Sequence, residues 1–176
     1  MKKIMITSLK SIVLFTLLCG VVYTVTVTAV GQILFSKQAN GSVVKQEING
    51  KTEVIGSSLI GQTFTGENYL HGRPTKVSQL SPVSKTQEEL VNERVKQADV
   101  KELPIELVTA SASGLDPEIS VDGAMSQVER IAVARNMKKA DVRAIIKQNI
   151  VGLKMGSISS QRVNVLGVNQ QLDESE

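Results

Sequence analysis

An uninterrupted stretch of uncharged residues dominates the N-terminal part of the chain. From Ser11 to Phe35 there is no Asp, Glu, Lys or Arg, and roughly 20 apolar residues at helical rise suffice to cross a hydrocarbon core. Many of these residues are β-branched, but in lipid the backbone must satisfy its own hydrogen bonds, which favours a helix. The pattern therefore predicts a transmembrane helix over residues 11–35, preceded by a short N-terminal segment, residues 1–10.

The lysines around this segment predict its direction. Lys2, Lys3 and Lys10 precede it, whereas Lys37 and Lys45 follow at greater distance. Because positively charged flanks stay in the cytoplasm, we expect residues 1–10 to be cytoplasmic and the rest of the chain to be extracytoplasmic, anchored in the plasma membrane.

Two other readings of the same segment place the anchor differently. A signal peptide could be cleaved after Val27-Thr28-Ala29, or a lipoprotein anchor could form at Cys19. A signal peptide has an apolar region of only about 7–15 residues, and this one is longer. Leu18 stands where a lipoprotein signal has a small residue. We therefore favour an uncleaved anchor.

The pattern then becomes mixed, as expected for one globular domain. Residues 36–50 are polar and form a predicted linker, in which Asn49-Gly50 is a turn signal. Val43-Val44 and Val54-Ile55 flank that signal and predict a short hairpin. The Gly-rich stretch from Gly56 to Pro74 predicts loops. We assign residues 51–170 to the domain and residues 171–176 to a loose acidic tail.

Three segments have helical periodicity. Apolar residues recur every three or four positions in 87–100, which ends before Pro104. Ser120 is a candidate N-cap for a helix that runs to about Arg135 and stops at Asn136 in a left-handed conformation. A further helix is predicted over 139–149.

Two segments alternate as strands do. These are residues 105–109 and residues 162–169. Together the elements predict an α+β fold: a single N-terminal transmembrane helix followed by one extramembrane α+β domain.

Composition removes several functional classes. Lys2, Lys3 and Lys10 account for the whole net charge of +3, so the domain has no basic surface for nucleic acid. Beyond Phe35 the only aromatic residues are Phe64 and Tyr69, too few for a base-stacking surface. One Cys cannot form an internal disulfide, and one Cys with one His cannot make a usual zinc site.

Motifs for nucleotide hydrolysis are missing as well. The sequence contains no G-x-x-x-x-G-K-[ST] and no D-K-T-G. A serine hydrolase would need Ser111 or Ser113 as nucleophile and His71 as base, but the run Ala110–Gly114 lacks the first glycine of a nucleophile elbow. The alternative is a tight turn whose hydroxyls bond the backbone.

The arginines leave two interpretations open. Arg73, in the compact segment Gly72-Arg73-Pro74, is either a partner contact or a structural cation that pairs with a carboxylate. Gln127 and Arg130 lie on one side of the predicted helix. Arg130 and Arg135 have the pattern of a solvated face.

Several segments together resemble one family, the C subunit of the Kdp potassium-transporting ATPase of bacteria and archaea. The matching residues are Gly56–Gln62 with Phe64, Tyr69–Pro74, Leu107–Pro117 with Ile119-Ser120, the set Gln127, Arg130, Ala132, Ala134 and Arg135, and Arg162–Leu166 with Asn169. The resemblance covers nearly the whole chain, and LVTASxSGLDPxIS is its most specific part. Glu118 departs from the family, which usually has His there.

The resemblance implies a non-catalytic subunit without a cofactor of its own. In that family a channel-like subunit carries potassium and a P-type subunit hydrolyses ATP. The C subunit is needed for assembly and is described as raising the affinity of the P-type subunit for ATP. The implied nucleotide contacts are Ser111, Ser113, Gly114 and Gln127.

The charge bias favours a different role for an outside domain. Such a domain could cap the potassium entrance of the channel-like subunit, with Arg73, Asp116 and Glu118 as candidate contacts and the carboxylates supplying negative potential. An effect on ATP would then be allosteric. A free-standing, membrane-anchored extracytoplasmic binding module is the alternative function.

Overall fold

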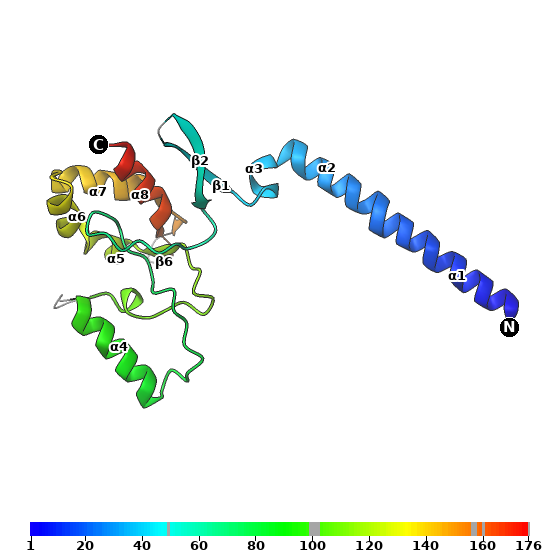
Figure 1. The fold of residues 1–176 in the computed structure, drawn as a ribbon, viewed down its shortest axis with the longest axis horizontal. Helices are drawn as coiled ribbons and strands as arrows, with labels where there is room; N and C mark the ends of the chain where they lie inside the picture. The colour runs from blue at the N-terminus through cyan, green and yellow to red at the C-terminus, as the bar shows by residue number, and fades with distance from the viewer. Residues whose placement is uncertain (49, 99–102, 156–157, 160, 176) are drawn as a thin grey trace. The chain divides into compact units, whose positions relative to one another are not determined.

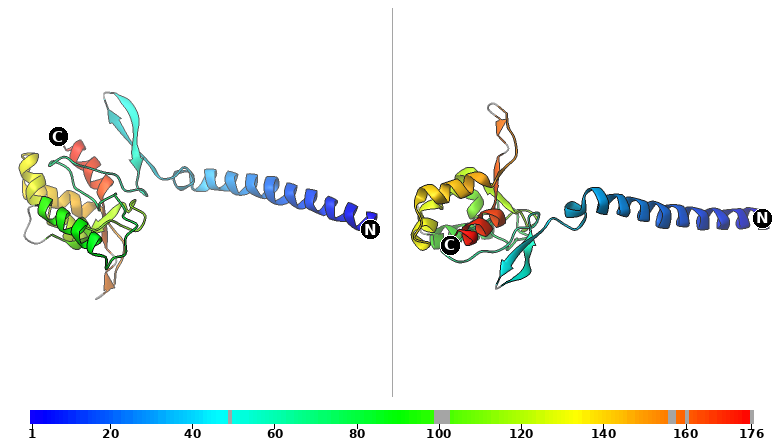
Figure 2. Two further views of the ribbon diagram at one scale, coloured as in Figure 1. Left: turned by 60° about the horizontal axis from the view of Figure 1, so that its bottom comes forward. Right: turned by 90° about the horizontal axis from the view of Figure 1, so that it is seen from above.

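The computed structural model describes residues 1–48, 50–98, 103–155, 158–159 and 161–175. It divides into two compact units, Met1–Val43 and Val44–Glu176. The first unit is almost entirely helical, and the second carries the helices and small sheets of an α+β domain (Figures 1 and 2).

The first unit contains a continuous helix from Lys2 to Leu34. It consists of α1 (Lys2–Leu17), a π-helical turn η1 (Leu18–Tyr23) and α2 (Thr24–Leu34). The wider turn leaves backbone carbonyls for side chains, and the Thr24 hydroxyl donates to the carbonyl of Cys19 at 3.1 Å. Among the described residues this is the one helix with the length and composition to cross a membrane. It begins nearer the N-terminus than the charge-free stretch alone predicted.

A short helix, α3 (Ser36–Ala39), follows where a polar linker was expected. Phe35 leaves helical geometry and separates it from α2. The side-chain amides of Gln32 and Asn40 exchange two hydrogen bonds, of 3.0 and 3.3 Å, and tie α3 to the end of α2.

The second unit begins with the predicted hairpin. Strand β1 (Val43–Ile48) pairs with β2 (Lys51–Ser57), and Gly50 between them has a φ of +73°, which glycine adopts without strain. Asn49 lies outside the described residues.

A three-stranded antiparallel sheet supports the core. Its order is β3–β7–β4, formed by β3 (Glu118–Ser120), β7 (Arg162–Asn164) and β4 (Ile150–Val151). Val163 of the central strand pairs with both Ile119 and Ile150. Strands β5 (Lys154–Met155) and β6 (Ile158–Ser159) form a separate pair that projects from the domain (Figure 2).

Four helices pack with this sheet. They are α5 (Val121–Met125), α6 (Val128–Ala134), α7 (Lys139–Gln148) and α8 (Val165–Glu174). The fully buried side chains of the core come from these helices, from the sheet and from one loop residue, Leu70; the largest are Leu70, Ile119, Ile131, Ile146 and Leu172.

Helix α4 (Lys85–Ala98) lies apart from α5–α8, and Figure 1 shows coil running between them. It confirms the helix predicted over 87–100 as far as Ala98; residues 99–102 lie outside the described part. Its apolar residues Leu90 and Val91 are half-buried, and Val95 is exposed.

Two predictions within residues 105–135 differ from the structure. Residues 105–109 are not a strand: Ile105–Leu107 form a 3₁₀ turn, η2, and both the amide and the hydroxyl of Thr109 donate to the carbonyl of Ile105. The helix predicted from Ser120 to Arg135 is two helices. The side chains of Ser126 and Gln127 both donate to the carbonyl of Gly123, so the ladder breaks there.

The C-terminal prediction also needs correction. The strand predicted over 162–169 ends at Asn164, and the expected loose tail, 171–176, belongs to α8 as far as Glu174. Asn164 caps α8 by accepting from the Gly167 amide at 3.0 Å, and Leu172 is fully buried. Two finer predictions are confirmed: Ser120 caps α5, and Asn136 is left-handed with a φ of +51°.

Candidate functional site

The segment Glu67–His71, called here the clamped loop, has its backbone held by side chains from distant parts of the chain. Its five consecutive carbonyls all accept hydrogen bonds from side chains. The donors are Arg130 for residues 67 and 69, Arg135 for residue 68, Asn169 for residue 70 and Gln127 for residue 71. Because unpaired buried carbonyls are costly, these side chains replace the partners that a sheet would give.

Two amide side chains imitate neighbouring strands. Asn169 accepts from the Leu70 amide at 2.7 Å and donates to the Leu70 carbonyl at 3.0 Å. Gln127 makes the same pair of bonds with His71, both at 2.9 Å. Gln127 also donates to the carbonyl of Gly123 and accepts from Arg130. Its amide is therefore fully used within the domain.

Arg135 is the most deeply buried of the arginines, with a side chain only 1% exposed. It donates to the carbonyls of Asn68 and Leu172 and forms a 2.6 Å ion pair with Asp173. Its guanidinium lies 5.0 Å from the centre of the Tyr69 ring. The prediction that Arg130 and Arg135 form a solvated face is thus wrong, because both side chains donate to carbonyls of the clamped loop.

Burial and charge also set the protonation of the loop. His71 is half-buried, and Nε2 donates to the carbonyl of Gly66 at 2.9 Å. Burial, aided by the positive charge of Arg130, lowers the pKa of His71 below its usual value. Burial likewise lowers the pKa of Arg130, which stays a cation.

Arg73 pairs with a carboxylate, as one of the two interpretations of this residue predicted. It forms a 3.2 Å ion pair with Asp116 and donates to the carbonyls of Thr109 and Ala110. The other carboxylate oxygen of Asp116 accepts from the Glu118 amide at 3.1 Å. One arginine therefore holds the turn Thr109–Pro117 from both sides.

Close backbone approach fixes the same turn. Gly114 has a φ of +69°, and a Cβ there would lie 2.6 Å from the carbonyl oxygen of Thr75. A Cβ on Gly61 would meet the carbonyl of Asp116 at 2.4 Å, while the Gly61 amide donates to Leu115. Both positions leave no room for a side chain.

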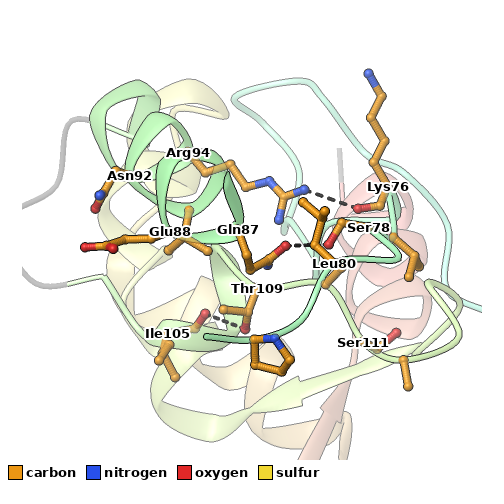
Figure 3. A pocket seen from close by; sticks show the side chains of 15 residues that line it. Lys76, Ser78, Leu80, Gln87, Glu88, Asn92, Arg94, Ile105, Thr109 and Ser111 are labelled. Atoms are coloured by element: carbon orange, nitrogen blue, oxygen red, sulfur yellow. Dashed lines mark hydrogen bonds between the residues drawn. The ribbon is translucent and has the colours of Figure 1, made fainter. Parts of the chain in front are cut away.

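Ser111 lines a pocket beneath α4, with a volume of about 480 Å³. Figure 3 shows its walls, which come from residues 76–82, from α4 and from residues 105–112. Arg94 of α4 donates to the carbonyls of Val108 and Lys76, which holds the helix over the pocket. Ser111 is 8% exposed, and its hydroxyl has no hydrogen-bond partner among the described residues.

The structure brings most of the predicted site residues together and separates one. Ser111, Ser113 and Gly114 share one turn with Asp116, next to Arg73, and Glu118 follows in β3. Gln127 instead bonds His71 of the clamped loop. Sequence reasoning did not single out Asn169 or Arg135 as site residues, although both occur in the matched motifs.

Comparison with known proteins gives the chain a family. Residues 5–174 match the family described as K+-transporting ATPase, c chain. The KdpC subunit of the potassium-transporting ATPase of Clostridium perfringens is 40% identical, with 97% of each chain covered. The corresponding subunit of Gloeobacter violaceus is also 40% identical, over 95% of this chain and 94% of its own. The chain belongs to the KdpC family.

KdpC membership and the apolar N-terminal helix together make this a membrane-anchored subunit of a K+-transporting ATPase. This confirms the resemblance drawn from the motifs, and the α+β domain after one helix confirms the predicted fold class.

The hydrolase interpretation finds no support in the geometry of this KdpC chain. His71 bonds the backbone of Gly66, and in the part of the chain that the structure describes the Ser111 hydroxyl bonds no other group. Ser113 accepts from the amide of Leu115, as a turn residue does. Within the described residues there is also no group of three His, Cys, Asp or Glu able to hold a metal ion.

Proposed function

We propose that the domain is a non-catalytic, accessory part of the potassium-transporting ATPase and acts by binding other subunits. The observation that carries this is how the polar side chains of the domain are used. Amide and guanidinium groups of the kind that bind ligands are instead hydrogen-bonded to the backbone of the domain itself; they belong to Gln127, Arg130, Arg135 and Arg73. A scaffold rigidified in this way suits a surface that other subunits recognise.

The proposed partners are a channel-like potassium-translocating subunit and a P-type ATP-hydrolysing subunit, as the family resemblance implies. The N-terminal lysines support an extracytoplasmic domain. From that side it would cap the potassium entrance of the channel-like subunit. Arg73 offsets the charge of Asp116, so among the three candidate residues Glu118 supplies the net negative charge.

Topology is the experiment that tests this role. Protease is added to intact spheroplasts that carry the chain with a C-terminal tag, and the tag is followed by blot. We expect digestion from outside. Protection of a domain that is cleaved once the membrane is broken would overturn the entrance role.

Assembly is tested separately. The tagged chain should co-purify from membranes with the channel-like and P-type subunits, and its deletion should abolish growth in micromolar potassium. A chain isolated as a stable monomer, with normal growth of the deletion strain, would instead indicate a free-standing binding module.

A second candidate is direct contact with ATP at Ser111, Ser113 and Gly114, which would raise the affinity of the P-type subunit for ATP. Ser111 favours it, because this residue lines a pocket of about 480 Å³ and its hydroxyl has no partner among the described residues. Gln127 cannot share this contact without releasing His71. ATP bound at these residues requires a cytoplasmic domain, so the protease experiment separates the two candidates.

A further inference from the structure

The charges of the extramembrane domain are segregated along the chain. Residues 36–176 contain 17 basic and 17 acidic residues, so this part of the chain is neutral as a whole. Residues 136–172 alone contain six Lys or Arg and a single acidic residue, Asp141, whereas the remainder has 11 Lys or Arg against 16 Asp or Glu. A neutral domain therefore carries a cationic region, built around α7 and β7.

Helix α7 presents part of this charge on one side. Arg143 and Lys147 are exposed and stand four residues apart, so they are neighbours on the helix surface. Neither forms an ion pair with another described residue. Lys139 continues the row one turn earlier and pairs with Glu129 at the exposed surface. Asp141 does not offset the row, because residues two positions apart do not face each other on a helix.

The surface next to this row allows close approach. Ala140 and Ala144 are exposed on α7 beside the cations, and their small side chains leave the charged groups as the most prominent features. Strand β4 begins two residues after α7 ends, and its Val151 pairs with Arg162 of β7. Arg162 is exposed as well, and its guanidinium donates to the carbonyl of the preceding residue. The cationic region thus continues from α7 onto the sheet.

A row of cations on the outside of a helix suits an extended anionic surface better than a single small anion, which is usually held by converging donors. The chain itself keeps one such surface within reach. The apolar helix ends at Leu34, and the second unit begins at Val44. Nine residues span at most about 30 Å. A short tether of this kind gives the domain a high effective concentration at the headgroups of the membrane that holds the helix.

We propose that Lys139, Arg143 and Lys147, with Ala140 and Ala144 beside them, form a membrane-docking face that binds anionic lipid headgroups. Basic residues near an anionic bilayer are attracted to it, and the attraction grows with their number. Docking would hold the domain against the bilayer and restrict its movement about residues 35–43. The inference rests on the membrane anchor and not on either candidate function.

The experiment follows the distance of this face from the lipid in the full chain. The chain is placed in nanodiscs of phosphatidylcholine alone or of an equal mixture with phosphatidylglycerol, each with headgroup spin-labelled lipid as quencher. In a Cys19→Ser background, a fluorophore is attached after Ala144→Cys on the docking face or, as control, after Asn92→Cys, which is exposed on α4. We expect strong quenching from residue 144 in anionic discs only, lost at high salt, and weak quenching from residue 92.

Two matched double variants test the cations. Arg143→Gln with Lys147→Gln removes two charges from the docking face, and Lys85→Gln with Lys96→Gln removes two exposed charges from α4. The first pair should lower the ratio of docked to free domain by about 25-fold, at about fivefold for each cation near an anionic surface. The control pair should leave this ratio nearly unchanged. All four side chains are exposed, so the unfolding midpoint should stay the same in both variants.

Several results would overturn the proposal. These are equal quenching from residue 144 in neutral and anionic discs, and equal losses in the two double variants. Inorganic phosphate at matched ionic strength should not release the domain, and release by phosphate would indicate a site for a free anion. In the assembled complex, a fluorophore at residue 144 that is shielded from the lipid quencher, with loss of another subunit in the docking-face variant, would identify an acidic protein segment as the occupant instead.

Discussion

Gln127 and His71 are joined by two hydrogen bonds, each 2.9 Å long, in which a side-chain amide takes the place of a neighbouring β-strand. Asn169 does the same for the preceding residue, Leu70. Since these residues lie far apart in the sequence, the conformation of the clamped loop depends on the complete domain.

Asn169→Ala should destabilise the domain strongly. Asn169 is 1% exposed, and its removal leaves the amide and the carbonyl of Leu70 without partners. Each unsatisfied buried group costs about 1–3 kcal/mol, so we expect a loss of about 2–4 kcal/mol. Chemical unfolding of the full chain in detergent measures it. Gln148→Ala, on an exposed position of α7, is the matched control and should change stability by less than about 0.5 kcal/mol.

Arg135→Ala should lower the free energy of unfolding about as much as Asn169→Ala, whereas Arg143→Ala should leave it nearly unchanged. Arg135 binds two backbone carbonyls and Asp173 from a buried position, and each buried carbonyl left without a partner costs about 1–3 kcal/mol. Arg143 is exposed on α7 and serves as control. Equal unfolding free energies for the two variants would show that the Arg135 contacts do not hold the loop.

Gly114→Ala and Gly41→Ala separate backbone strain from crowding. Both glycines have positive φ, +69° and +77°, so each substitution pays about 1–2 kcal/mol for a left-handed alanine. Only Gly114 is also crowded, by the carbonyl of Thr75 at 2.6 Å; a Cβ at Gly41 meets nothing within 4 Å. Gly114→Ala should therefore lower the free energy of unfolding by more than Gly41→Ala does, which chemical unfolding of the two variants measures.

Acidification should weaken the fold through His71. Its folded pKa lies below the unfolded value near 6.5, so the unfolded chain binds the proton more readily. Stability is thus fully present above about pH 6.5 and falls as the pH drops from there toward the folded pKa. His71 is the only histidine, and His71→Gln should remove this part of the pH dependence. Unfolding midpoints between pH 5 and 8 measure it, and parallel wild-type and variant curves would contradict it.

The parts of the fold that depend on short-range signals could be predicted from the sequence. Uncharged length gave the membrane helix, and Ser120 and Asn136 marked helix ends by their own local chemistry. The strand predicted over 162–169 extends too far because apolar and polar residues alternate there. The helical spacing of the buried residues in α8 becomes visible only when Leu172 is included. The strand predicted over 105–109 failed because a threonine hydroxyl can close a turn as well as it can sit in a strand.

The candidate site was predictable in part for the same reason. Ser111, Gly114 and Asp116 are neighbours along the chain, so their turn follows from sequence. The bonds of Gln127 to the clamped loop span 56 residues, and those of Asn169 span 99. The local sequence pattern does not distinguish a polar helical side chain that bonds a distant loop from one that faces solvent.

The clamp also determines when the domain can finish folding. The clamped loop is synthesised 99 residues before Asn169, a delay of about 5–20 s at ~5–20 residues per second. Its last partners, Asn169 and Asp173, lie within α8. The membrane helix is therefore made well before the domain can close, because the clamped loop has no complete set of partners until α8 has been synthesised.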